Sequence, residues 1–92
     1  MAQKSPRHKD FHKKITDLDD GAYDVSFQKK RYLLRKQTQL EGKLVKLYAE
    51  ELGGNDFISL NYYPDIKDGL LKPCEMPEQK VVDFILALKL FL

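Results

Sequence analysis

The stretch KLVKLYAEELGGNDFISLNYY, residues 43 to 63, predicts two half-buried β-strands joined by a tight hairpin turn. Apolar and polar side chains alternate on both sides of the glycine pair, as they do on strands with one buried face. The predicted apolar face comprises Val45, Leu47, Ala49, Ile58, Leu60 and Tyr62. Gly53 and Gly54 can supply positive φ, and Asn55–Asp56 is typical of turns. We expect the rest of the chain to pack around this ribbon.

The residues before the ribbon predict two further strands. Residues 22–28 alternate aromatic and β-branched side chains with polar ones, which is the clearest strand pattern in the chain. After a turn or bulge at Lys29–Lys30, residues 31–39 continue as a strand with less strict alternation. Glu41–Gly42 then turns into the ribbon.

Helices are predicted at both ends of the chain. Residues 7–18 place apolar side chains at helical spacing among lysines and histidines. After the ribbon, Pro64 ends the strand, and residues 70–72 favour a short edge strand. Pro77 is suited to the first turn of a helix, which we expect to continue to the end of the chain.

The C-terminal helix is apolar on two sides. One stripe suffices to cover a face of the sheet and comprises Val81, Phe84, Ile85, Leu88 and Leu92. Leu86 and Leu90 lie on roughly the opposite side, which suggests a second burial partner. Either a second copy of the chain or the N-terminal helix and tail would cover them.

Together these elements predict a single α+β domain over residues 7–92, preceded by a disordered tail at residues 1–6. The expected order is a short helix, four or five antiparallel strands in a meander, and a helix packed on one face of the sheet. A chain of 92 residues has a thin core, so homodimerisation would be a natural supplement.

Composition narrows the class of protein. Hydrophobic residues make up 42% of the chain and charged residues 33%, as in soluble globular domains. No apolar run reaches membrane length, and no apolar segment follows the basic N-terminus, so we expect neither a membrane protein nor a secreted one. A single cysteine fits a reducing compartment, and we predict a cytoplasmic location.

The residues typical of catalytic and metal sites are sparse. His8 and His12 have the spacing of a metal pair on a helix, but the adjacent lysines oppose a cation, and no third ligand is placed by the sequence. Cys74 is the one soft nucleophile, and an inert thiol is the favoured interpretation. We therefore expect no enzyme activity, no metal and no cofactor.

Charge is distributed unevenly along the chain. Residues 1–46 carry twelve lysines and arginines against six acidic residues, whereas residues 47–92 carry four against eight. The basic half interleaves cations with aromatic residues, which is the combination that binds single-stranded nucleic acid. Lys36 belongs to this basic series, and the predicted contact residues are Lys29, Lys30, Arg31, Arg35, Lys43, Lys46 and Tyr48. We expect these cations to stand together on the solvent side of the sheet.

Several short motifs resemble the single-stranded-DNA-binding domain of the positive-cofactor-four transcriptional coactivators. They are Phe27–Gln28, Arg31–Tyr32, Glu41–Gly42–Lys43–Leu44–Val45 with Glu50, and Pro77–Glu78–Gln79. The resemblance implies a curved antiparallel sheet followed by a helix, with dimerisation through the helices. It also implies that basic and aromatic strand residues hold unpaired DNA.

A second resemblance is to small uncharacterised bacterial proteins, some of which are labelled peptide methionine sulfoxide reductase. It rests on residues 47–54, 57–61 and 71–77, which include Cys74. The glycine–cysteine–phenylalanine–tryptophan signature of that reductase is absent. This resemblance implies only an uncharacterised domain. The alternative to nucleic-acid binding is a small protein-interaction or regulatory domain, dimeric through its two-sided C-terminal helix, and a reductase acting through Cys74 is less favoured.

Overall fold

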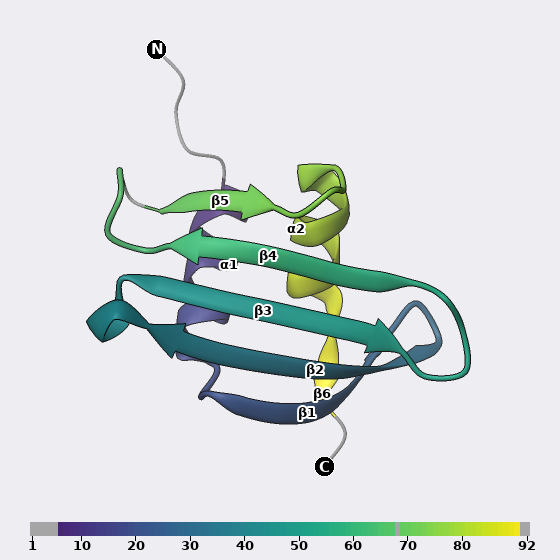
Figure 1. Cartoon of the computed structure of the whole chain (residues 1–92). Coiled ribbons are helices and arrows are strands. Elements are labelled where there is room, and N and C mark those ends of the chain that lie inside the picture. Colours follow the sequence, from purple (N-terminus) through teal and green to yellow (C-terminus); the bar gives the residue numbers. More distant parts are fainter. Residues whose placement is uncertain (1–5, 68, 91–92) are drawn as a thin grey trace.

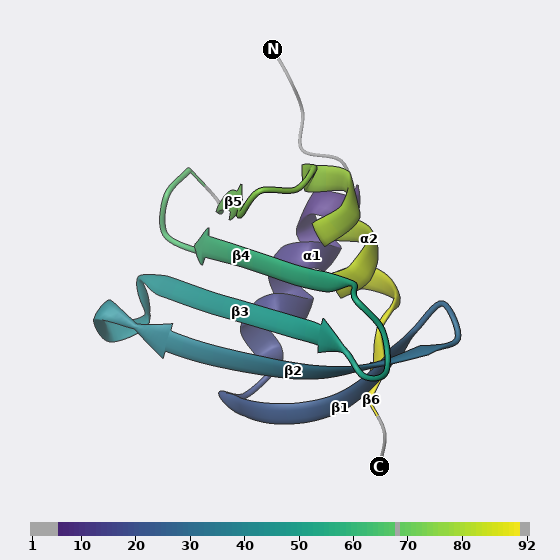
Figure 2. The same ribbon diagram turned by 45° about the vertical axis from the view of Figure 1, so that its right-hand side comes forward.

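The computed structural model describes residues 6–67 and 69–90, with side chains from residue 9 onward in those ranges. They form two layers, an antiparallel sheet and two helices packed on one of its faces (Figure 1, Figure 2). The elements in chain order are α1 (Pro6–Asp17), β1 (Gly21–Phe27), β2 (Lys30–Gln39), the short 3-10 helix η1 (Leu40–Gly42), β3 (Leu44–Glu51), β4 (Phe57–Tyr63), β5 (Leu70–Pro73), α2 (Glu78–Ala87) and β6 (Lys89–Leu90).

The strands lie side by side in the order β5-β4-β3-β2-β1-β6, and every pair is antiparallel. The first five therefore form the predicted meander, and the α+β class with a helix at each end is confirmed. The tail predicted at residues 1–6 lies outside the described residues except for Pro6, where α1 begins. Neither described helix has the length and apolar character needed to cross a bilayer.

The β1–β2 hairpin turns at Gln28–Lys29, whose φ values are 51° and 67°. Two consecutive residues with positive φ match the right-handed twist of the flanking strands, as in type I′ turns. Phe27 therefore pairs directly with Lys30. The turn lies one residue earlier than the Lys29–Lys30 pair suggests, and Lys30 is the first residue of β2.

The β3–β4 hairpin closes where the Glu51 amide donates to the Asp56 carbonyl at 2.8 Å. Gly53 has the expected positive φ, 81°, but Gly54 does not adopt one, so that part of the prediction is wrong. A Cβ at Gly54 would instead lie 2.3 Å from the Glu51 carboxyl carbon. Gly54 leaves room for this carboxylate, which accepts a hydrogen bond from the Asp56 amide at 3.2 Å.

The core lies between the sheet and the two helices. Its strand side comprises Val25, Tyr32, Leu34, Val45, Leu47, Ala49, Ile58, Leu60 and Tyr62. Its helix side comprises Phe11, Ile15, Val81, Phe84, Ile85 and Leu88. The predicted apolar face of the ribbon and the α2 stripe are thus confirmed, except for Leu92, which lies outside the described residues. Tyr23 and Phe27 pack against this core as half-buried side chains.

The C-terminal segment differs from the prediction of a helix reaching the chain end. α2 ends at Ala87, and Leu88 is extended, with φ −62° and ψ 149°. Two α2-terminal carbonyls, those of Leu86 and Leu88, accept hydrogen bonds from Lys14 Nζ at 3.2 and 2.9 Å. A cation is favourable at a helix C-terminus, where carbonyls lack helical partners. The chain then adds β6 to the free edge of β1, opposite Val25 and Ser26.

Candidate nucleic-acid interface

The face of the sheet opposite the helices is not covered by any described element (Figure 2). Strand residues that alternate with the core residues point to this side, because successive side chains of a strand face opposite ways. We call this surface the open face. Its outward residues on β1 to β5 include Asp24, Arg31, Leu33, Arg35, Gln37, Lys46, Tyr48, Glu50, Phe57, Ser59, Asn61 and Lys72.

Four residues from four adjacent strands form one row across the open face. Gln37 pairs with Lys46, and Asn61 pairs with both Lys46 and Lys72. We call these four residues the polar row. Because neighbouring strands lie about 4.8 Å apart, the row spans about 14 Å from β2 to β5. Lys46 and Lys72 are exposed and Asn61 is half-buried, so the row presents two amides and two ammonium groups.

A second row lies two residues along the strands from the polar row. Here Arg35 of β2 is opposite Tyr48 of β3, which is opposite Ser59 of β4. Arg35 and Tyr48 are both exposed. This row places a guanidinium and a phenol ring beside the two lysines of the polar row.

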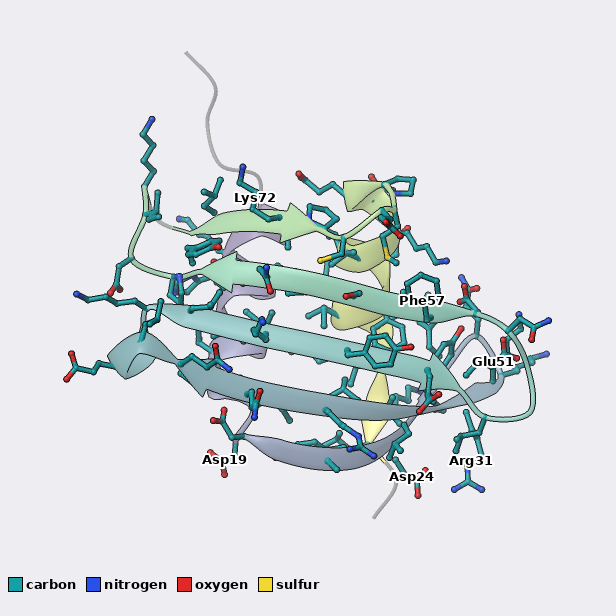
Figure 3. All side chains as sticks on the ribbon, viewed as in Figure 1. Asp19, Asp24, Arg31, Glu51, Phe57 and Lys72 are labelled. Atoms are coloured by element: carbon teal, nitrogen blue, oxygen red, sulfur yellow. The ribbon has the colours of Figure 1, made fainter. Side chains whose placement is uncertain are left out.

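Tyr48 also stacks on Phe57 of β4. Their ring centroids are 6.1 Å apart, and the ring planes are inclined by 29°. The two side chains remain 44% and 37% exposed, so ring surface faces solvent although large aromatic side chains are usually buried. Figure 3 shows Phe57 over β4 on the open face.

The rows border a shallow depression of about 650 Å³. Its floor is the sheet itself, and the outward side chains around it include Arg35, Lys46, Tyr48, Asn61 and Cys74. Cys74 reaches this place because its amide donates to the Ser59 carbonyl at 2.9 Å, just beyond the end of β5. Cationic, amide and aromatic groups thus surround one open hollow on the surface.

The other end of the open face, toward the β1–β2 hairpin, is acidic. Arg31 lies 3.4 Å from Asp24 across β1 and β2, and Figure 3 shows the two side chains together below that end of the sheet. Glu50 follows on β3, between Leu33 and Phe57. The unbalanced positive charge of the open face is therefore concentrated around the polar row and Arg35.

The structure brings together only part of the predicted contact set. Arg35, Lys46 and Tyr48 lie side by side in the two rows. Lys29 instead lies in the β1–β2 turn and Lys30 begins β2 next to it, whereas Lys43 precedes β3 at the opposite end of the sheet. The expectation that all these cations stand together is wrong, because strand length separates residues that are close in sequence. Arg31 is on the open face but pairs with Asp24.

Lys36, the remaining member of the basic series, points into the core side. It is 5% exposed, and its Nζ donates to the Leu18 carbonyl just after α1. Burial lowers the pKa of Lys36, while nearby acidic residues, Asp20 first, oppose this shift. Lys36 therefore stabilises the end of a helix and is not available to an external anion.

Four residues of the site were not predicted from the sequence, namely Gln37, Phe57, Asn61 and Lys72. The signal for Asn61 was present, because it alternates with the predicted apolar positions of β4. Lys72 lies in the short edge strand, and only strand pairing places it in line with Lys46. Gln37 and Asn61 carry no charge, so a cluster of charges in the sequence does not identify them.

The histidines and Cys74 were the candidates from the sequence for a metal or catalytic site. His12 Nδ1 lies 2.5 Å from the Tyr62 hydroxyl, and burial raises the pKa of Tyr62 to about 12. The His8 side chain lies outside the described part of the chain, and no group of three His, Cys, Asp or Glu residues in the described part is placed to hold a metal ion. Cys74 is a free, half-buried thiol.

A second hollow lies on the helix side of the molecule. It measures about 410 Å³ and is lined by α1, the end of α2 and β6, with Ile15, Leu18, Ile85, Leu88 and Leu90 among its residues. Leu90 is 42% exposed on β6, whereas Leu86 is half-buried against the core. The N-terminal helix packs against α2. Leu90 lies on β6 and not on the helix, so the prediction that it shares a helix side with Leu86 is wrong.

No family model, curated protein or solved structure matches this chain. The two resemblances drawn from short motifs therefore stay predictions.

Proposed function

We propose that this protein is a small non-catalytic module that binds single-stranded nucleic acid on the open face. The observation that carries the proposal is that Arg35, Lys46 and Tyr48 border one hollow on the open face. Lys72 lies in the same row as Lys46, and Phe57 stacks on Tyr48. Cations neutralise phosphates, and exposed aromatic rings accept unpaired bases. This chemistry is also what the coactivator resemblance implies.

The aromatic pair favours a single strand over a duplex. The bases of a duplex are already stacked on one another, so their faces are not accessible to Tyr48 and Phe57. In an unpaired strand each stacked base contributes about 1–3 kcal/mol to binding. The amides of Gln37 and Asn61 supply donors and acceptors for base edges at the same level of the sheet.

The test is fluorescence anisotropy of labelled oligothymidine of about twelve nucleotides, compared with a duplex of equal length. We expect the single strand to bind more tightly than the duplex. With three phosphate contacts, log Kobs should fall against log salt with a slope of about −2. An absence of binding at about 20 mM salt would contradict the proposal.

A matched pair of variants locates the binding surface. Tyr48→Ala removes an exposed ring from the open face, whereas Leu52→Ala removes an exposed apolar side chain from the β3–β4 turn. We expect Tyr48→Ala to weaken oligonucleotide binding by about 1–3 kcal/mol and Leu52→Ala to leave it unchanged. Equal effects would place the interaction elsewhere.

A second candidate function is self-association on the helix side. The apolar hollow between α1 and β6, with Leu90 exposed at its border, favours it. Sedimentation velocity at rising protein concentration tests this candidate, with Leu90→Lys as the variant expected to shift the protein toward the monomer. A monomer at all concentrations would remove it.

A further inference from the structure

A nucleic-acid strand bound to the open face has two possible paths over the sheet. One direction follows the length of β2, past Arg31, Leu33 and Arg35. The other crosses the strands from Arg35 and Gln37 on β2 to Lys72 on β5. The charges and polar groups beside each direction decide between them.

The direction along β2 is unfavourable for phosphates. Its first cation, Arg31, already lies 3.4 Å from the Asp24 carboxylate. The next outward residue is Leu33, which is apolar and lies between Asp24 of β1 and Glu50 of β3 in the pairing of the strands. A backbone running this way would meet two carboxylates before it reached Arg35.

The direction across the strands meets cations and amides instead. Lys46 and Lys72 lie on strands two apart, about 9.6 Å from each other, with Asn61 between them. Arg35 lies beside Lys46 in the neighbouring row, and Tyr48 next to it carries the stacking surface. No carboxylate belongs to either of these rows among the described residues.

We infer that the single strand crosses the sheet from β2 to β5 and that the site holds a short segment of about four nucleotides. This inference rests on the proposed function. The limit follows from the width of about 14 Å between β2 and β5, which four nucleotides of a stacked strand cover if each occupies about 3.4 Å. Lys72, at the edge strand, binds the end of the segment.

A length series of oligothymidines tests the footprint. Oligomers of about two, three, four, six and twelve nucleotides are titrated at low salt, and each Kd is corrected for the number of overlapping positions on the oligomer. We expect corrected affinity to rise up to about four nucleotides and then to stay within about threefold. A further tenfold gain between six and twelve nucleotides would overturn the short footprint.

A matched pair of charge changes tests the direction. Lys72→Gln and Arg31→Gln each remove one positive charge from an exposed position on the open face. We expect Lys72→Gln to weaken binding about fivefold and to reduce the salt slope by about 0.7, with Arg31→Gln changing binding less than twofold. A larger loss with Arg31→Gln would show that the strand runs along β2.

The outcomes separate this inference from the proposed function. If the oligomer of about twelve nucleotides does not bind at all, the proposed function and the footprint both fail. If it binds but the corrected affinity keeps growing, the short footprint fails, and if Arg31→Gln has the larger effect, the crossing direction fails. In both cases the proposed function stands.

Discussion

Lys36 and Lys46 lie in neighbouring strands of one sheet and face opposite ways. Lys36 is 5% exposed, and its ammonium group donates to the Leu18 carbonyl beyond the end of α1. Lys46 is exposed in the polar row, between Gln37 and Asn61. The same residue type thus stabilises a helix end on one face and is accessible to an external phosphate on the other.

The comparison extends to the aromatic residues of the two faces. On the buried face Tyr32 of β2 contacts Phe84 of α2 edge to face, with the ring centroids 5.0 Å apart. On the open face Tyr48 and Phe57 stack at 6.1 Å with ring surface exposed. Changes to the buried face should therefore alter the free energy of unfolding, whereas changes to the open face should alter binding.

The largest effect is expected from Phe84→Ala, compared with Phe57→Ala. Phe84 is fully buried, so its truncation leaves a cavity and should lower the free energy of unfolding by about 3–5 kcal/mol. Phe57 is 37% exposed, and its truncation should cost less than about 1 kcal/mol of stability while weakening oligonucleotide binding. Urea denaturation measures the first quantity and anisotropy the second. Similar losses of stability would contradict the division between the faces.

Gly69→Ala should follow in size, at about 2–3 kcal/mol of unfolding free energy. Gly69 has φ 116°, and an added Cβ would lie 2.0 Å from the buried Tyr62 hydroxyl. Gly53→Ala is the control, because φ is 81° there and nothing lies within 4 Å of the added Cβ. The control should cost only about 1–2 kcal/mol of backbone strain. Thermal or urea unfolding that ranks the two variants the other way would refute the close contact.

A pH-dependent effect is expected at Asp56, which joins the core to α2. Its carboxylate accepts from the Tyr32 hydroxyl at 2.7 Å and from Lys80 Nζ at 2.6 Å. Burial acts to raise the pKa of Asp56, but these hydrogen bonds and the Lys80 charge hold it below the ordinary value of 3.8. Its contribution to stability is therefore complete above that value and lost as the pH falls through the lower, folded-state pKa.

Asp56→Asn should reduce this loss. We expect the variant to be about 1–2 kcal/mol less stable near neutral pH and closer to the wild type at about pH 3. Urea midpoints measured at both pH values provide the test. A constant difference between the two proteins would show that the Asp56 charge does not contribute to the fold.

The smallest effect on stability should come from Lys46→Gln, within about 0.5 kcal/mol. Because Lys46 is exposed, the fold does not depend on its charge. Binding of labelled oligothymidine should weaken by up to about 1 kcal/mol, or roughly fivefold in Kd. Unchanged binding at low salt would exclude Lys46 from the site.

The strand pattern was predictable because burial on one face imposes a period of two on Val45, Leu47 and Ala49. The end of α2 was not, because Lys14, on another helix, donates hydrogen bonds to the carbonyls at this end. The pairing of β6 with β1 likewise joins segments far apart in the sequence, which no local pattern encodes.

The site was predictable only in part, because it too depends on the pairing of strands that are far apart in the sequence. Arg35, Lys46 and Tyr48 were identified from charge and alternation, and they lie together. Lys72 joins them only through the pairing of β4 with β5, and Lys36 leaves the set because its position on β2 faces inward. Charge along a sequence does not tell which face of a strand a residue occupies when alternation is weak.

The most direct test of the open face compares two double charge reversals. Arg35→Glu/Lys46→Glu changes adjacent residues of the two rows, whereas Lys29→Glu/Lys30→Glu makes the same change of charge at the β1–β2 turn. Anisotropy with oligothymidine of about twelve nucleotides, at about 20 mM salt, should show binding abolished in the first protein and retained within about fivefold in the second. Equal losses in both proteins would mean that only net charge attracts the oligonucleotide, and would contradict a binding site on the open face.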